Sequence, residues 1–368
     1  MRSSSTPKTR PESDLQALDA LFEQVGLQRK LRSKAAGVTQ RMRFTHAAQL
    51  VLIPAAPVPR VASNGVEWLP VEGWEKHGWL WHGFSTRRGG LSRAYCADDA
   101  PGELNLGFTA ADGRETVLRN RRLLAEAITG DPTTPLAALK QIHSNKIALA
   151  GAADTSRKQP WKRGVPGDRS SSLGCKADGL MTDEPGLLLA IQTADCIPVL
   201  VADRKRRAVA AFHAGWRGTV KRIVESGVGR MRLEFGSRPE DLIAAIGPGI
   251  GPCCYAVGED ALSEFESQFA YALELFREVY DADPVRTKYP MLFLTQRAPG
   301  HTSIGPSLHL NLIEANRRQL LAAGLKPRAI QTVGGCTSCQ RELFFSHRAS
   351  QGHAGRMMSV IGIRPDAR

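Results

Sequence analysis

The chain lacks several features that mark common classes of protein. No apolar stretch approaches the roughly 20 residues needed to span a bilayer, and the basic segment 1–10 is not followed by the apolar run of a secretory signal. We therefore expect a cytoplasmic protein with no membrane partner. No internal repeat is visible. No zinc-finger, RRM or helix-turn-helix pattern accompanies the formal charge of +13, so specific nucleic-acid binding is not expected.

Cysteine is scarce and odd in number, with seven in 368 residues. Such a set does not form a disulfide framework, so we expect reduced thiols. Cys336 and Cys339 form a single CxxC motif. Because no second pair accompanies it, a structural zinc site is not supported there, and a buried or redox-inert pair is the expectation.

Composition indicates a globular protein, since 42% of the residues are hydrophobic and 23% are charged. We divide the chain into a basic N-terminal extension, 1–45, and one main domain, 46–368, with its first strand near Leu50. The extension holds nine Lys/Arg against four Asp/Glu, and a capping box at Ser13 and Gln16 predicts one short helix over 13–25. The polar stretch 151–176 is expected to be a long loop.

Two later segments have the apolar periodicity of helices. The first runs from 258 to 280, with Leu262, Phe265 and Phe269 beginning its apolar face. The second begins at Asn311, with Glu314 three residues on, and ends at Gly324.

The most informative stretch is 187–233. Apolar runs predict strands at 187–191, 197–202 and 208–213, and a helix follows from Thr219. If the second and third strands form a hairpin in which Val201 pairs with Ala208, then Cys196 lies opposite His213. Their Cβ atoms would be about 4.5–5.5 Å apart on one face.

A thiolate and an imidazole at that separation suit either a shared metal ion or a thiolate–imidazolium pair. A catalytic zinc site uses three protein ligands and keeps one position open. His143, in the polar segment LKQIHSNKI, is the best third candidate. Each residue also has a structural interpretation, in which the cysteine is buried and each histidine is simply hydrogen-bonded.

Several motifs in fixed order resemble one known family. The main ones are KQIHS (140–144), ADGLMTD (177–183), TADCIPVLVAD (193–203), FHAGWRGT (212–219), IGPGIGPCCYAVG (246–258) and GGCTSCQRELFFSHR (334–348). Together with FSTRRGGLS (84–92), NLGF (105–108) and GRMMSVIGI (355–363), they resemble the laccase-domain family over about residues 50–363. Proteins of that family were first named multicopper polyphenol oxidases and are now regarded as purine nucleoside phosphorylases with adenosine deaminase activity.

The resemblance implies an α/β (α+β) sandwich of mixed β-sheets with flanking helices in a single catalytic domain. It also implies zinc bound by His143, Cys196 and His213, with purine nucleosides (adenosine, inosine, guanosine and methylthioadenosine) and phosphate as substrates. Copper is less favoured, because a multicopper centre needs many imidazoles and the chain has nine histidines and no His-x-His pair. The oligomeric state is left open.

The implied reactions suggest roles for further residues. Deamination needs a carboxylate that moves a proton, and Asp178 and Asp195 are the candidates. Phosphorolysis needs cations for phosphate, and Arg217, just before the predicted helix, and Arg87 are attractive. Asn105 and Gln141 could bind ribose or base. On a structural interpretation, the two aspartates are turn residues and the other four are exposed loop residues.

Two other functions remain open on the sequence. In a metal-free hydrolase, His213 would activate Cys196 as a nucleophile. In a basic binding module, the cluster would be vestigial.

Overall fold

The computed structural model describes residues 58–97, 99–151, 175–279 and 307–365. The predicted helix at 13–25, the strand near Leu50 and nearly all of the 151–176 loop lie outside these residues. All described residues belong to one compact unit, Leu52–Arg368.

Two six-stranded mixed sheets form the centre of the domain. The first has the order β1(Arg60–Val61), β2(Glu67–Leu69), β3(Leu80–Ser85), β16(Met357–Ile363), β8(Leu188–Thr193), β5(Leu136–Ala138). The second has the order β15(Ile330–Thr332), β11(Leu242–Ile246), β9(Ile197–Asp203), β10(Val209–Ala214), β7(Gly179–Thr182), β6(Ile147–Leu149). Most neighbours are antiparallel, but β5 and β8, β6 and β7, and β11 and β15 run parallel.

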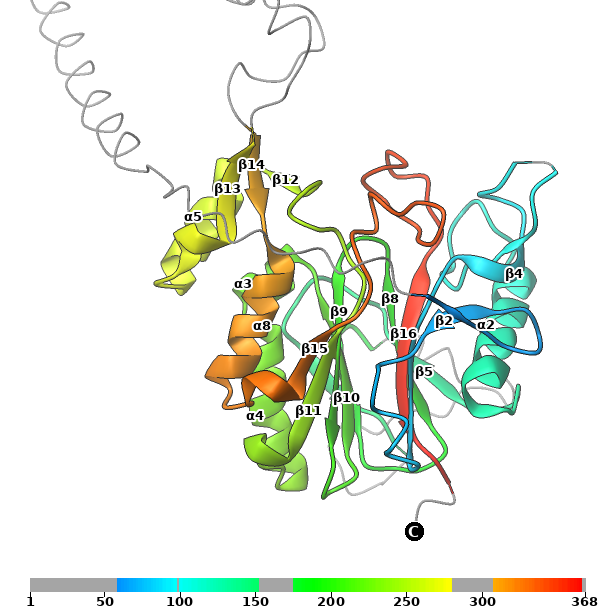
Figure 1. Ribbon diagram of the computed structural model, residues 1–368, viewed down its shortest axis with the longest axis horizontal. Helices are drawn as coiled ribbons and strands as arrows, with labels where there is room; N and C mark the ends of the chain where they lie inside the picture. Colours follow the sequence, from blue (N-terminus) through cyan, green and yellow to red (C-terminus); the bar gives the residue numbers. More distant parts are fainter. Residues whose placement is uncertain (1–57, 98, 152–174, 280–306, 366–368) are drawn as a thin grey trace, which may run out of the picture. The chain divides into compact units, whose positions relative to one another are not determined.

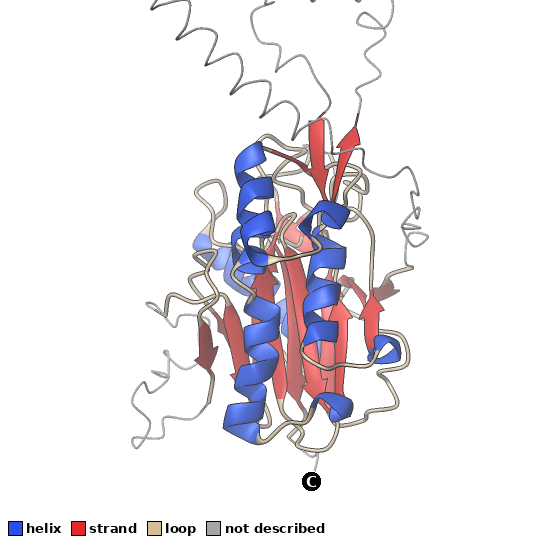
Figure 2. Cartoon of the chain, turned by 90° about the vertical axis from the view of Figure 1, so that its left-hand side faces the viewer, coloured by secondary structure: helices blue, strands red, loops and turns tan. Residues whose placement is uncertain are grey.

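The two sheets pack face to face, and helices cover their outer faces (Figure 1). Every residue of β9 and β10 is buried, because these strands contact the other sheet on one side and helices on the other. The helix α2(Arg114–Thr129) packs on the first sheet. The helices α4(Ile223–Phe235) and α8(Leu312–Ala322) lie side by side over the second sheet (Figure 2). The predicted α/β sandwich of mixed sheets is therefore confirmed.

A small third sheet corrects the predicted helix 258–280. Only α5(Glu259–Gln268) is α-helical; a short 3-10 turn, η2(Ala272–Leu275), and the strand β13(Phe276–Val279) follow it. β13 and β12(Ala256–Val257) flank β14(Ser307–Leu310). The helix ends at Gln268, and the backbone of its C-cap, Phe269, is extended. Phe265 packs against both Phe269 and Phe276, so the apolar spacing reflects one cluster built from a helix and a strand.

The central hairpin forms, but its register differs from the predicted one by two residues. Val201 pairs with Ala210 rather than Ala208, and His213 lies opposite Pro198. The cause is the turn: Asp203 accepts hydrogen bonds from the backbone N–H groups of Lys205 and Arg206, and this closes a wider loop. Because the shift is even, every side chain keeps the face that was predicted for it.

The helices near this hairpin agree in part with prediction. The helix α8 has Asn311 as its N-cap, whose side chain accepts a hydrogen bond from the Glu314 N–H, as predicted. The helix expected from Thr219 is two helices, α3(Trp216–Val220) and α4, which are separated by Arg222 in a left-handed conformation. Arg217 therefore lies within the first turn of α3 rather than before a helix.

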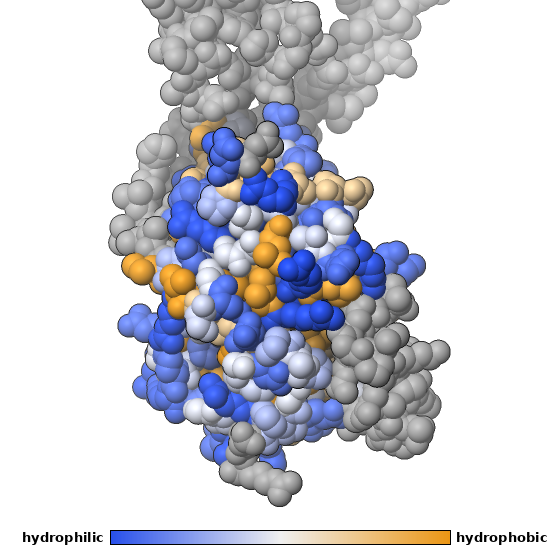
Figure 3. All heavy atoms as spheres, turned by 90° about the vertical axis from the view of Figure 1, so that its right-hand side faces the viewer, coloured by the Kyte–Doolittle hydropathy of each residue, from blue (hydrophilic) through white to orange (hydrophobic). Residues whose placement is uncertain are grey.

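Shorter elements complete the domain: β4(Arg88–Ser92) and the 3-10 turns η1(Pro239–Asp241) and η3(Pro327–Ala329). The side of the domain that carries α2 is mostly hydrophilic, with hydrophobic side chains gathered near its middle (Figure 3). Among the described residues, no helix combines the length and the apolar character required to cross a membrane.

Candidate metal centre

The three predicted ligands lie at one end of the second sheet. Cys196 directly precedes β9, and His213 is the penultimate residue of β10. His143 comes from the loop between β5 and β6. Asp195 and His143 both have positive φ angles, of 94° and 57°, so the two loops turn sharply where they meet.

The structure brings these side chains together. One potential ligand atom from each lies within 4.8 Å of the other two. Cys196 Sγ is 3.9 Å from His143 Nε2, and the two imidazole rings meet edge to face with centroids 4.9 Å apart. In a tetrahedral zinc site, sulfur and nitrogen ligands are about 3.6 Å apart, given the usual bond lengths. One ion therefore fits among them with small movements.

Asp178 orients both histidines through hydrogen bonds. Its side chain is fully buried, and Oδ1 accepts a hydrogen bond from His213 Nδ1 at 2.9 Å. Oδ1 also accepts from the N–H groups of Ile142 and His143, while Oδ2 accepts from the N–H and the hydroxyl of Ser144. This arrangement leaves His213 Nε2 to face the other ligands, as in a carboxylate–histidine–metal triad.

The same contacts also determine the charge of Asp178. Burial acts to raise its pKa, but hydrogen bonds from His213 and Ser144 outweigh burial and lower this pKa to about 2. A carboxylate that accepts five hydrogen bonds and stays ionised is poorly suited to carry a proton. Asp178 thus positions His143 and His213 through its hydrogen bonds, and a catalytic role for Asp178 stays a prediction.

Asp195 is also engaged within the fold. Its Oδ1 accepts a hydrogen bond from the Thr337 hydroxyl and its Oδ2 accepts one from the Arg348 backbone N–H, both at 2.7 Å. Its carbonyl oxygen accepts from the N–H of Ile250. Asp195 thereby joins three loops beside Cys196, and its side chain is used in holding them.

Cys196 and His213 form an electrostatic pair. Burial acts to raise the pKa of Cys196, but the adjacent rings of His213 and His143 lower it to about 6. Burial acts to lower the pKa of His213, while Cys196 and Asp178 favour its protonated form and raise this pKa to about 9. The cysteine is thus ready to act as a thiolate, the form in which it binds metal.

Gly215 leaves the space that the centre needs. A Cβ atom at this position would lie 2.9 Å from Cys196 Sγ and 3.0 Å from His143 Cδ2. The φ of Gly215 is −67°, so its backbone would accept any residue, and only the neighbouring ligands require glycine.

Polar groups that sequence reasoning missed stand beside the centre. The charges of Cys196, Arg348 and Arg217 all affect the pKa of Tyr255, which rises mainly through burial. The Arg348 guanidinium lies over the Tyr255 ring, 5.4 Å from its centroid, and Arg217 lies over the ring of its neighbour Trp216. Tyr255 and Arg348 occur in the motifs CCYAVG and FFSHR, but no spacing rule marks them as part of this site.

The other predicted binding residues make contacts within the fold. Asn105 is fully buried, and its side chain hydrogen-bonds Gly107, Asp112 and the Arg356 N–H. It is therefore not the exposed loop residue of the structural interpretation, because both N–H groups and both acceptor positions of its amide are used within the fold.

Gln141 and Arg87 connect segments of the domain. The Gln141 amide pairs with both backbone groups of Gln192, which fixes the start of the His143 loop. The Arg87 guanidinium forms an ion pair with Glu103 at 2.6 Å and lies over the Phe345 ring. Substrate binding by these two residues stays a prediction.

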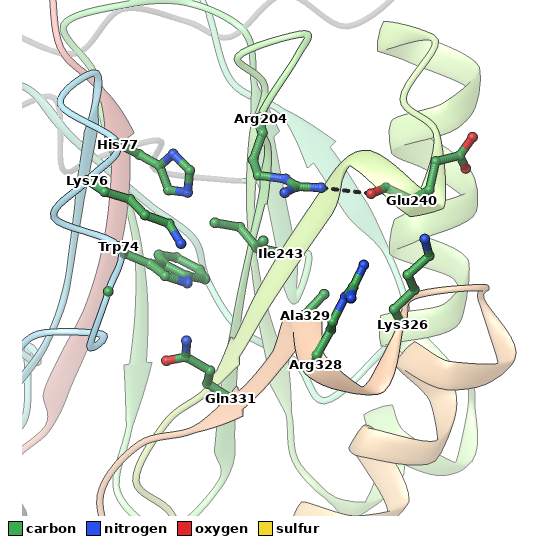
Figure 4. Close-up of a pocket in the computed structure, with 11 residues that line it drawn as sticks. Trp74, Lys76, His77, Arg204, Glu240, Ile243, Lys326, Arg328, Ala329 and Gln331 are labelled. Atoms are coloured by element: carbon green, nitrogen blue, oxygen red, sulfur yellow. Dashed lines mark hydrogen bonds between the residues drawn. The ribbon is translucent and has the colours of Figure 1, made fainter.

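A basic cavity of about 330 Å³ lies away from the centre (Figure 4). Lys76 and His77 line one side, Lys326 and Arg328 line another, and Arg204 donates a hydrogen bond to the Glu240 carbonyl oxygen. Arg204 follows the last residue of β9, whereas Cys196 precedes the first. A seven-residue strand is about 23 Å long, so this cavity belongs to the opposite end of the sheet.

Comparisons with known proteins agree with this architecture. The chain is 35% identical to "Purine nucleoside phosphorylase YlmD" of Geobacillus stearothermophilus over 285 residues, which cover 77% of this chain and 90% of that protein. It is 28% identical to human "Purine nucleoside phosphorylase LACC1" over 287 residues, 55% of that longer protein.

A solved structure gives the same result for the fold. The crystal structure of YlmD from Geobacillus stearothermophilus matches with a TM-score of 0.63 and 30% identity, over 84% of this chain and 99% of that one.

Residues 81–364 match the family model described as multi-copper polyphenol oxidoreductase laccase. The chain therefore belongs to this laccase-domain family.

Proposed function

We propose that the protein is a zinc-dependent purine nucleoside phosphorylase that also deaminates adenosine, with one centre formed by His143, Cys196 and His213. The observation that carries the proposal is the convergence of these three donors in a chain whose relatives are named purine nucleoside phosphorylases. Adenosine, inosine, guanosine and methylthioadenosine are the substrates to test.

The donor set favours zinc over a multicopper centre. One thiolate and two imidazoles with an open fourth position are the ligand types of catalytic zinc. Among the described residues, the second group that could hold a metal contains four cysteines and no histidine. This part of the chain contains no further group of clustered ligands for a trinuclear copper centre, which needs many imidazoles.

Zinc bound here would act as a Lewis acid that polarises an oxygen atom of the substrate or of water. In phosphorolysis, a phosphate oxygen forms a bond to C1′ of the ribose and the C1′–N glycosidic bond breaks. The products are ribose 1-phosphate and the free purine, whose ring nitrogen takes the proton. In deamination, water adds at C6 of adenosine and ammonia leaves.

The protein's own residues serve these reactions by binding and orientation. Arg217 and Arg348 are cations whose charges, like that of Cys196, act on Tyr255, and a guanidinium can bind two phosphate oxygens at once. Since α3 has only five residues, the charge of Arg217 matters more than the start of the helix. Tyr255, with its raised pKa, keeps its proton at neutral pH and can donate a hydrogen bond to ribose or phosphate.

The metal-free hydrolase has one observation in its favour. Without a metal, Cys196 and His213 are held as a thiolate and an imidazolium, which is the state of an activated cysteine nucleophile. The position of His143 favours the metal centre instead, because its Nε2 lies 3.9 Å from the same sulfur. Alkylation of Cys196 separates the two: a metal centre predicts protection by zinc and release of protection by a chelator.

The activity test uses the full chain loaded with zinc. Inosine plus phosphate should yield hypoxanthine and ribose 1-phosphate, and adenosine without phosphate should yield inosine and ammonia. Cys196→Ser and His143→Ala should abolish both activities, while Cys96→Ser, outside both cysteine-containing clusters, should leave them intact. No hypoxanthine under any metal loading would refute the phosphorylase, and equal base release without phosphate would indicate a hydrolase.

Arg217→Ala tests the phosphate contact. Loss of one charge-assisted hydrogen bond is worth about 1.5–3 kcal/mol, so the KM for phosphate should rise roughly 10- to 100-fold. The KM for inosine should change little. Arg230→Ala is the matched control, since Arg230 is exposed on α4 and pairs with Glu234. Equal effects on both KM values would argue against a specific phosphate role.

A further inference from the structure

Four cysteines from two distant segments come together beside the candidate metal centre. Cys253 and Cys254 lie in the turn after β11, and Cys336 and Cys339 lie in the turn after β15. Because β11 and β15 are parallel neighbours, the turns that follow them emerge at the same edge of the sheet. The Thr337 N–H donates to the Gly249 carbonyl oxygen and joins the two turns.

The sequence expectation for the CxxC motif assumed that no second pair of thiols accompanies it, and this assumption is wrong. The second pair of thiols is present, but it is the adjacent pair Cys253-Cys254 rather than another CxxC. One pair alone would hold no structural metal, whereas two pairs supply a complete set of four sulfur ligands.

The distances suit one ion. The four sulfur atoms all lie within 4.8 Å of one another, and Cys339 Sγ is 3.4 Å from the sulfurs of both Cys253 and Cys254. With zinc–sulfur bonds of about 2.3 Å, the edges of a tetrahedron are about 3.8 Å. A cluster of several irons would require wider spacing between sulfurs that bind different metal atoms.

The residues around the four cysteines donate a hydrogen bond to sulfur and leave space for the sulfur atoms. The Gly251 N–H donates a hydrogen bond to Cys336 Sγ at 3.2 Å. A Cβ atom at Gly251 would lie 3.1 Å from Cys336 Cβ and 3.2 Å from Cys253 Sγ, so glycine leaves room for the sulfurs to close around an ion. Cys336 is buried, so the group extends from the interior to the exposed Cys339.

We propose that Cys253, Cys254, Cys336 and Cys339 bind a second metal ion, a structural zinc that fastens the β11 and β15 turns together. Four thiolates form a soft donor set that selects zinc or iron over magnesium or calcium. All four positions are occupied by protein ligands, so the site is closed to substrate and its role is structural.

The second site supports the first through Asp195. The Thr337 hydroxyl, between the two CxxC cysteines, donates to Asp195 Oδ1, and the Ile250 N–H donates to the Asp195 carbonyl oxygen. Each of the two turns therefore holds the residue that precedes Cys196. An ion that fastens the turns would fix the approach of Cys196 to its histidine partners.

Metal content per chain tests the proposal independently of enzymatic activity. Wild type and the control Cys96→Ser should each contain two ions, Cys196→Ser should keep one, and Cys339→Ser should lose at least the structural ion. After cobalt substitution, Cys196→Ser should show the intense sulfur-to-cobalt charge transfer of four thiolates. Because Cys196→Ser retains all four cysteines of the second site, it tests the proposal even if Cys339→Ser fails to fold.

The contrary results are equally clear. One ion in wild type and none in Cys196→Ser would overturn the second site, and so would disulfides among the four cysteines in freshly purified protein denatured without reductant. Iron in place of zinc would support the four-thiolate site and change only its occupant. None of these readouts depends on whether nucleosides are substrates.

Discussion

Substitution of Gly215 by alanine should weaken metal binding at the candidate centre without unfolding the domain. The added Cβ would lie 2.9 Å from Cys196 Sγ, whereas ordinary contacts begin near 3.4 Å. The sulfur, or the loop of Gly215, must therefore move by about 0.5 Å. Metal sites keep their ligand distances within about 0.2 Å, so the ligands cannot all remain in place.

The size of the effect follows from this geometry. Displacement of one ligand should cost at least as much as loss of an outer-sphere partner, which lowers metal affinity by about 10- to 100-fold. We expect a loss near the upper figure, equal to about 2.7 kcal/mol of binding free energy. Folding should suffer less, since overpacking typically costs 1–3 kcal/mol and the φ of −67° at Gly215 suits alanine.

Competition with a fluorescent zinc chelator measures the affinity, and thermal unfolding of the metal-free proteins measures the fold. Gly229→Ala is the matched control, because a Cβ there meets nothing within 4 Å. Wild-type affinity in Gly215→Ala would refute the reasoning, since the three donors could not then lie where the structure places them.

Three further predictions concern the fold and the ligand support. The pKa of the buried His82 is lowered to about 4, mainly by burial, so the unfolded chain takes up a proton between pH 6.5 and 4 and the folded domain does not. The free energy of unfolding should therefore fall by up to about 3 kcal/mol as pH drops through that window, and His82→Gln should reduce the fall in denaturant titrations. Gly227→Ala would place a Cβ 2.2 Å from the Phe212 ring and should cost about 1–3 kcal/mol, whereas Gly229→Ala in the same helix should stabilise by about 1 kcal/mol. Asp178→Asn should lower zinc affinity about 10- to 100-fold in the chelator assay, and an unchanged affinity would show that His213 needs no carboxylate partner.

Local patterns predicted the central strands because their apolar runs are continuous. The strands β8, β9 and β10 lie where the runs at 187–213 indicated, since both of their faces are covered. Helix boundaries were less predictable. The spacing of Phe265, Phe269 and Phe276 fits one helix, yet pairing with β14 outweighs it and turns the last part into a strand.

Features that depend on distant contacts could not be predicted from spacing. Asp178 joins the His143 loop to His213 through buried hydrogen bonds, and nothing in the sequence reveals that one carboxylate serves both. The four-cysteine group was missed for the same reason. Its two pairs are more than 80 residues apart, and only the parallel pairing of β11 with β15 brings them together.

The hairpin shows why a site can be inferred from an imperfect register. The actual turn moves His213 by two residues along its partner strand, so it faces Pro198 instead of Cys196. Strand side chains alternate with a period of two, so an even error changes the distance along the strand and preserves the face. Cys196 also lies just outside the strand, and the positive φ of Asp195 bends the chain there. An odd error would have predicted the thiol and the imidazole on opposite faces of the strand pair, so the prediction of this centre depended on the parity of the register and not on its exact value.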